Sequence, residues 1–116
     1  MNVKETYLYF AENESADGAG DSHVYPASTF TGIDPISATT TRISFKALAG
    51  TAADDDILVT HVTGKFKSIA QALANALSDD SGELVIFMDE DNTIYSKMLR
   101  DLGCIDSSTA LNITLG

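Results

Sequence analysis

The sequence predicts an α+β domain that is mainly β: an antiparallel sheet, sandwich or barrel of about six to seven strands with one helix packed on it. Short segments of alternating apolar and polar residues predict the strands, and residues 65–77 alone show clear helical spacing. Strands and helices also do not alternate as they do in a doubly wound parallel sheet. The 116 residues suit a single domain, which we expect to span residues 1–116.

The first third of the chain predicts strands that are separated by a long loop. Residues 6–10, TYLYF, favour a strand because aromatic side chains fit a pleated surface. Residues 11–22, AENESADGAGDS, predict a flexible loop. Residues 23–29, HVYPAST, predict an extended segment at a sheet edge, since Pro26 lacks a backbone N–H. Residues 32–35, GIDP, predict a turn.

The middle third predicts two strands and the helix. Residues 42–48, RISFKAL, alternate as a half-buried strand does. Residues 57–63, ILVTHVT, carry apolar side chains in both alternating sets, which predicts a central strand covered on both faces. Residues 65–77 repeat apolar side chains every three or four positions, and Thr63 is expected to cap this helix.

The last third predicts a hairpin, a short helical turn and a closing strand. Residues 83–88, ELVIFM, predict a buried strand, 89–92, DEDN, a turn, and 93–98, TIYSKM, its hairpin partner. Residues 98–102 predict a helical turn or an irregular segment. Residues 110–115, ALNITL, alternate cleanly and predict the closing strand.

The charge of the chain excludes several kinds of partner. Seventeen acidic and 7 basic residues give a formal net charge of −10, and residues 5–41 and 68–96 contain no Lys or Arg. Binding to nucleic acid or to an anionic membrane requires a positive surface. We therefore expect neither, whereas an acidic surface maintains solubility and suits a basic protein partner.

Cysteine usage and hydropathy indicate where the protein is made. Cys104 is the only cysteine, so neither an intrachain disulfide nor a zinc site built on several cysteines is expected. The first residues, MNVKETYLYFAENES, do not have the pattern of a signal peptide, and no apolar run approaches the ~20 residues of a transmembrane helix. We expect synthesis in a cytoplasm, without secretion by a signal peptide.

The three consecutive aspartates at 54–56 allow a metal, a catalytic or a structural interpretation. A metal site needs carboxylates that converge on one point. Neighbouring strand residues point to opposite faces, so three in a row do not converge within a strand. The favoured interpretation is a solvated loop end whose charges protect the next strand from mispairing.

A second acidic segment partly matches a calcium-binding loop. Asp89, Asp91 and Thr93 follow the opening spacing of such a loop. Ile94 stands where the loop requires glycine, and Arg100 stands where a bidentate glutamate belongs. A hairpin turn is favoured, and a calcium-dependent binding module stays open as an alternative.

His61 is the main candidate for acid–base chemistry. A small hydrolase could use His61 with an acidic partner such as Asp56 or Asp89. The sequence has no G-x-S-x-G, H-E-x-x-H or phosphate-loop motif beside it. We therefore favour a hydrogen-bonded structural or interface histidine and expect no catalytic residue, no cofactor and no metal.

Aromatic residues are concentrated in the first 30 positions. A small domain with one helix has limited means to cover them, so some are expected either in the core or on an association surface. The residues are Tyr7, Tyr9, Phe10, Tyr25 and Phe30.

The order of segments resembles small virion structural proteins of marine tailed bacteriophages, especially those that infect cyanobacteria. The resemblance covers residues 6–115 and rests on TYLYF, VYPASTFTGIDPISATTTRISFKAL, DDDILVTHVTG, the helix KSIAQALANAL, LVIFMDEDN and the closing ALNITL. It implies a non-enzymatic virion component, such as a capsid- or tail-associated decoration or stabilising protein.

The same resemblance implies a β-rich homo-oligomer, with a trimer favoured, that contacts other virion proteins. Unpaired strand edges and exposed aromatics would then be buried between subunits. The first aromatic strand and the last strand are the predicted interface elements. The candidate interface residues are Tyr7, Tyr9, Phe10, Tyr25, Leu111, Ile113 and Leu115.

Overall fold

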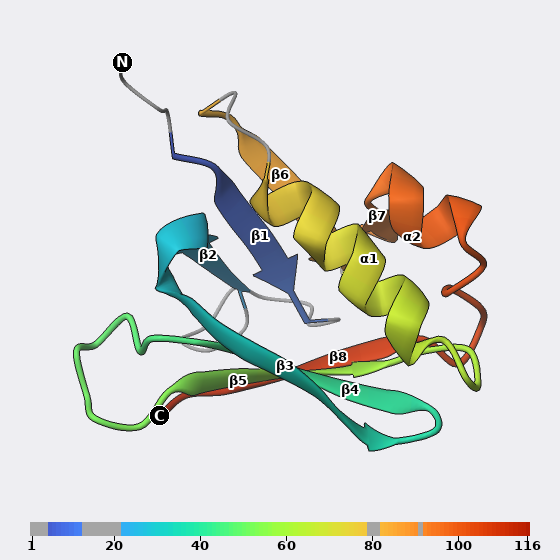
Figure 1. Cartoon of the computed structure of the whole chain (residues 1–116), viewed down its shortest axis with the longest axis horizontal. Coiled ribbons are helices and arrows are strands. Elements are labelled where there is room, and N and C mark those ends of the chain that lie inside the picture. The colour runs from blue at the N-terminus through green and yellow to red at the C-terminus, as the bar shows by residue number, and fades with distance from the viewer. Residues whose placement is uncertain (1–4, 13–21, 79–81, 91) are drawn as a thin grey trace.

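The described part of the chain folds into two four-stranded sheets with two α-helices (Figure 1). The computed structural model describes residues 5–12, 22–78, 82–90 and 92–116. Sheet A has the strand order β2-β1-β6-β7, and sheet B has the order β3-β4-β5-β8. The strands are β1 (Tyr7–Ala11), β2 (Ser22–Pro26), β3 (Phe30–Ser37), β4 (Thr40–Phe45), β5 (Asp55–Thr60), β6 (Leu84–Asp89), β7 (Ile94–Tyr95) and β8 (Ala110–Thr114). The predicted mainly β, α+β class is confirmed, with eight strands among the described residues instead of the six to seven expected.

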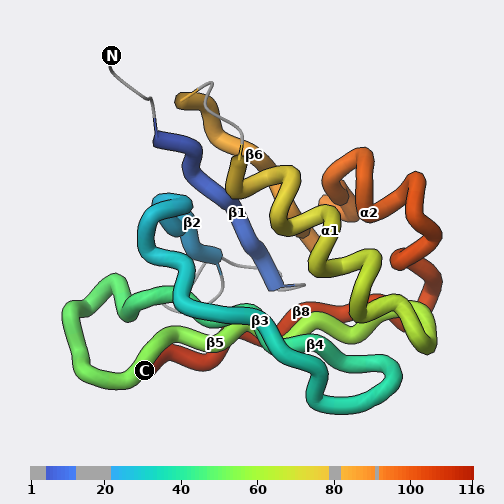
Figure 2. The backbone as a smooth tube through the Cα atoms, viewed as in Figure 1, coloured from blue at the N-terminus to red at the C-terminus, as the bar shows by residue number. Residues whose placement is uncertain are grey.

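The backbone passes between the two sheets several times (Figure 2). It leaves sheet A after β2, forms β3 to β5 of sheet B, returns through α1 to β6, and enters sheet B again at β8. Strand β8 pairs with β5, to which it is antiparallel. The last strand of the chain is therefore an edge of sheet B.

Sheet A contains one parallel pair, which the sequence did not predict. Strand β1 pairs with β6 in parallel, with a register shift between Tyr9 and Phe10, while β2 and β7 pair antiparallel at the two edges. A parallel pair requires a long crossover connection, and here β2–β5 and α1 all lie between the two strands in the chain.

The inner faces of the two sheets enclose an aromatic core. Phe10 lies at its centre, with ring centroids 5.5 Å from Phe87, 5.7 Å from Phe45 and 6.2 Å from Tyr25. Tyr25 stacks on Phe45 at 4.6 Å. Alternation along the strands produces this core, because β4 and β5 both bury every second residue.

The helices close one side of the sandwich. Helix α1 (Phe66–Leu77) contacts β6 of sheet A and β4 of sheet B, and α2 (Lys97–Asp101) packs beside it (Figure 1). Burial of Ile69 and Leu73 contributes about 1.5–3 kcal/mol each. The predicted cap at Thr63 is wrong: the N-cap is Lys65, and no side chain caps this end.

Two local predictions need correction, and a third falls largely on residues that the structure does not describe. Residues 32–35 are not a turn but part of the edge strand β3, whose register shifts on either side of this segment accommodate Gly32 and Pro35. Strand β5 is central in sheet B, but it is covered on one face only, because Leu58 is part-exposed. The predicted loop at 11–22 falls mostly on residues 13–21, which lie outside the described residues.

In the described part of the chain, no helix is long and apolar enough to cross a membrane.

Candidate functional site

The three aspartates diverge. Asp54 is exposed and accepts a hydrogen bond from the Thr31 hydroxyl at 2.7 Å, whereas Asp56 lies on the outer face of sheet B and accepts from Ser44 at 2.7 Å. Asp55, between them, is buried. Within the described residues, no group of three or more His, Cys, Asp or Glu side chains could hold a metal ion. Asp54 and Asp56 both line a hollow on the outer face of sheet B, whereas Asp55 faces the interior, so the three carboxylates do not converge on one point.

Asp55 is a structural anchor, which corrects its interpretation as a solvated charge. Its carboxylate accepts from the Tyr25 hydroxyl at 2.9 Å, from the Gly116 N–H at 2.9 Å and from the Leu48 N–H at 3.4 Å. These three donors come from sheet A, from the last residue of the chain and from the β4–β5 loop. A buried carboxylate is tolerated because hydrogen bonds replace its hydration.

Both ring nitrogens of His61 are engaged in hydrogen bonds. Nδ1 lies 2.8 Å from the Val62 carbonyl oxygen, and Nε2 lies 2.8 Å from the Thr41 hydroxyl. A carbonyl only accepts, so Nδ1 donates, and Nε2 of the neutral ring accepts from Thr41. The side chain is buried and follows the end of β5. This arrangement is that of a hydrogen-bonded structural histidine.

The acids considered as partners of His61 are bound elsewhere. Asp56 bonds to Ser44, and both carboxylate oxygens of Asp89 accept from Asn92, through its backbone N–H at 3.1 Å and its side-chain amide at 3.0 Å. Asp89 therefore closes the turn after β6. Asp91, the second position of the calcium-loop match, lies outside the described residues.

Two tyrosines have raised pKa values, which predicts a loss of stability in alkali. Burial, with the hydrogen bond to Asp55, raises the pKa of Tyr25 above its ordinary value of 10.0, and burial with the charge of Glu90 raises the pKa of Tyr95 to about 12. The folded state retains both protons at pH values where the unfolded chain releases them. The contribution of Tyr95 is therefore fully present below pH 10 and is lost as the pH rises to about 12, while that of Tyr25 starts to decline at the same pH and continues to decline at higher pH.

Urea unfolding at a series of pH values from about 8 to about 12 measures this loss. The double variant Tyr25→Phe/Tyr95→Phe is expected to flatten the alkaline decline. Leu48→Ala, an exposed substitution in the loop before β5 that removes no titratable group, serves as the control and should leave the decline unchanged. An equally steep decline in the double variant would show that other groups cause it.

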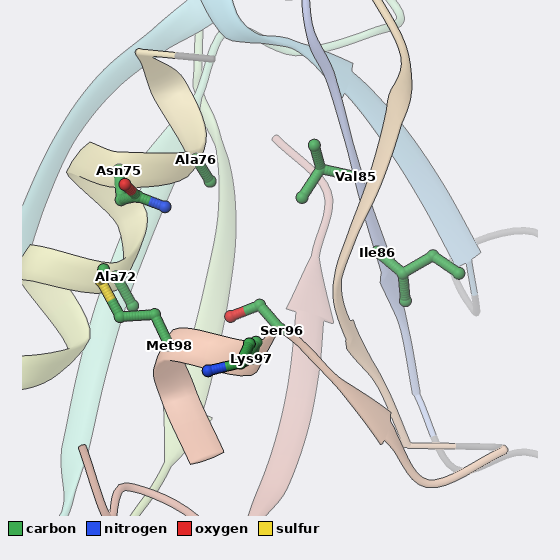
Figure 3. Close-up of a pocket in the computed structure, with 8 residues that line it drawn as sticks. All are labelled: Ala72, Asn75, Ala76, Val85, Ile86, Ser96, Lys97 and Met98. Carbon is green, nitrogen blue, oxygen red and sulfur yellow. The ribbon is translucent and has the colours of Figure 1, made fainter. Parts of the chain in front are cut away.

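A groove lies between α1, β6 and the start of α2 (Figure 3). It encloses about 240 Å³, and Lys97 is the one titratable residue in its lining. Lys97 forms an ion pair with Asp101, and the Ser96 hydroxyl accepts from the Leu99 N–H as the cap of α2. The groove thus holds no nucleophile paired with a base.

A second hollow of about 420 Å³ lies on the outer face of sheet B. Its centre is the cross-strand pair of Arg42 and Asp34, joined by two hydrogen bonds of 2.8 and 3.1 Å. The hydrogen bonds to Asp34, together with its negative charge, raise the pKa of Arg42. The acids around it are matched to donors, so the hollow is a satisfied polar surface.

The outer face of sheet A is apolar. Tyr9 is in register with Val24 on one side and Ile86 on the other, and Figure 3 shows Ile86 directed away from α1 while Val85 is directed toward it. Directly opposed residues in neighbouring strands project from the same face. The exposed fractions are 40% for Tyr7, 39% for Val24 and 53% for Leu84. We call this surface the A face, and its residues are Tyr7, Tyr9, Val24, Pro26, Leu84 and Ile86.

The A face includes two of the predicted interface residues, Tyr7 and Tyr9. Phe10 and Tyr25 are fully buried in the core of the chain itself, which corrects their assignment to an interface. The physical reason is alternation: Tyr9 and Phe10 are adjacent, so they face opposite sides of the sheet. The apolar members contributed by β2 and β6 were missed, although the same alternation within 22–26 and 84–89 could have indicated them.

The predicted interface residues of the last strand also divide between core and surface. Leu111 and Ile113 are 7% and 8% exposed and belong to the core, so their side chains are not a free surface. Leu115 follows β8 and is 49% exposed. The outward-facing part of β8 is the backbone along its edge of sheet B.

No family model matches this chain, and neither a curated protein nor a solved structure shows significant similarity to it.

Proposed function

We propose that this protein is a non-enzymatic structural component that self-associates through the A face, in the manner of a decoration or stabilising protein of a tailed-phage virion. The observation that carries the proposal is the continuous apolar surface formed by Tyr7, Tyr9, Val24, Leu84 and Ile86 across three neighbouring strands. Contiguous exposed apolar surface is characteristic of protein–protein contact.

The charge distribution supports the same conclusion. The six residues of the A face are all uncharged, whereas the whole chain carries a formal charge of −10. Two copies of an acidic chain repel each other least when uncharged surfaces, such as their two A faces, are in contact. Tyrosine is also enriched in protein–protein interfaces. A homotrimer, which the resemblance to virion proteins favours, would direct three A faces toward a common axis.

The polar side chains favour a structural role over a hydrolase. His61 is held by Thr41 and by a backbone carbonyl, and Asp56 and Asp89 are bonded to other partners. Acid–base catalysis requires a histidine that can reach a substrate proton and exchange it. A calcium-binding module remains testable, because calcium in the millimolar range should then raise the melting temperature.

Light scattering on the Leu84→Lys variant tests the self-association. We expect the wild-type chain to show a fixed oligomer, with three copies of the 12.3 kDa chain as the favoured mass. Leu84→Lys places a charge in the A face and should shift the protein to monomers. Leu48→Lys is the matched control, because Leu48 is also about half exposed but lies in the β4–β5 loop. A monomeric wild type, or equal effects of the two variants, would overturn the proposed interface.

The virion assignment has a separate test. Mass spectrometry of purified particles of the phage that encodes the chain should detect it in many copies per particle. Its absence from particles would contradict the virion role, whatever its oligomeric state.

A further inference from the structure

The four sheet edges in the described part of the chain differ in how they are protected. Strand β7 has two residues, and β3 contains Pro35 and two register shifts. Strand β2 ends at Pro26, which has no backbone N–H to donate. Such features discourage pairing with another chain. Strand β8 has none of them: its five residues, ALNIT, pair with β5 without a register shift and include no proline, glycine or charge.

A carboxylate takes the place of a partner strand on β8. The Ile113 N–H donates to Glu12 Oε2 at 3.2 Å. Ile113 lies opposite Ile57 of β5, but its N–H points to the other side of β8, away from β5. Outward-facing backbone groups recur at every second residue of an antiparallel strand. Among the described residues, the edge therefore presents the backbone groups of Leu111 as well as Ile113, and Glu12 occupies one of its donors.

The surroundings of this edge are acidic. Glu12 lies on Ile113, and Asp106 lies shortly before β8, where its carboxylate accepts hydrogen bonds from Ser108. The strand itself is uncharged. An added strand that carries Lys or Arg would meet the Glu12 carboxylate at Ile113, on a chain whose formal charge is −10.

We infer that the β8 edge accepts an extended, basic segment of a partner protein as an added strand. The backbone of the segment would form hydrogen bonds with the outward backbone groups of Leu111 and Ile113. The Glu12 carboxylate would release the Ile113 N–H and form an ion pair with a lysine or arginine of the partner. Strand addition of this kind gains affinity from main-chain hydrogen bonds and specificity from alternate side chains. A second copy fits less well, because a symmetric β8 pair would bring two Glu12 carboxylates together and supply no cation. This surface is distinct from the A face and does not depend on the proposed self-association.

Peptide titration of the full chain tests the inference. The probe is an acetylated and amidated eight-residue peptide that alternates valine and lysine. We expect it to bind about tenfold or more tightly than a valine–threonine peptide, and to weaken as salt is added. A valine–lysine peptide with a central proline keeps the charge but cannot pair as a strand, so it should lose binding. Equal binding of the proline peptide would overturn strand addition in favour of unspecific charge attraction.

Two further readouts locate the contact. Amide hydrogen exchange at Leu111 and Ile113 should slow when the valine–lysine peptide is added, and unchanged exchange at both would exclude the β8 edge. In Glu12→Ala the valine–threonine peptide should bind more tightly and the advantage of the basic peptide should shrink, because the carboxylate both blocks the edge and attracts the cation. The chain alone could instead form dimers, in a concentration-dependent way, that already protect the Leu111 and Ile113 amides from exchange. That result would assign the edge to a second copy and overturn the inference.

Discussion

Replacing Asp55 by alanine is expected to lower the free energy of unfolding by about 3–4 kcal/mol. The substitution leaves three donors without their acceptor: the Tyr25 hydroxyl and the backbone N–H groups of Leu48 and Gly116. The Tyr25 hydroxyl lies beside the aromatic core, where an unpaired polar group is costly. For a domain whose total stability is on the order of 5–15 kcal/mol, this is a large fraction.

Chemical denaturation of Asp55→Ala and of its neighbour Asp54→Ala measures the difference. Asp54 is exposed, and its loss should cost about 0.5 kcal/mol or less. A double-mutant cycle with Tyr25→Phe should show a coupling energy, because one hydrogen bond joins the two side chains. Similar losses for the two aspartates would contradict the anchor role of Asp55.

The second large effect is expected for Phe10→Ala, at about 3–5 kcal/mol. The ring of Phe10 is fully buried and contacts Tyr25, Phe45 and Phe87, so its removal leaves a cavity between the sheets that their rigid rings cannot fill. Both sheets lose contact at the same point, because Phe10 and Phe87 belong to sheet A and Phe45 to sheet B.

Thermal and urea unfolding of Phe10→Ala test this expectation. Leu48→Ala removes a large apolar side chain that is 50% exposed and serves as the control, with an expected loss of about 0.5 kcal/mol. A small loss at Phe10 would mean that the two sheets do not pack through the aromatic cluster.

Local sequence patterns were sufficient to predict most elements. The alternation in ALNITL and RISFKAL and the helical spacing of residues 65–77 each matched the observed element to within a few residues. These patterns are reliable because each records which face of a single element is buried, and that requires no knowledge of its neighbours. The prediction of a turn at residues 32–35 was wrong because Gly and Pro, which are typical of turns, are equally compatible with an irregular edge strand.

The candidate sites depended on distant residues. Asp55 could be separated from Asp54 and Asp56 only by its contacts with Tyr25 and Gly116, which are 30 and 61 positions away. The bond from Ile113 to Glu12 spans 101 positions. No local pattern encodes such contacts, because they follow from the order in which strands enter the two sheets.

The sequence by itself thus determined that this is an acidic, mainly β domain with one substantial helix, since composition and periodicity are local properties. Only the tertiary structure decided which aromatics are core and which form the A face, and which sheet edge remains open. The physical reason is that the parallel pairing of β1 with β6 and the return of β8 to β5 are long-range choices. They decide that the side of β1 with Phe10 becomes the core while the side with Tyr9 stays outside, and they leave Glu12 bonded to the free edge of the other sheet.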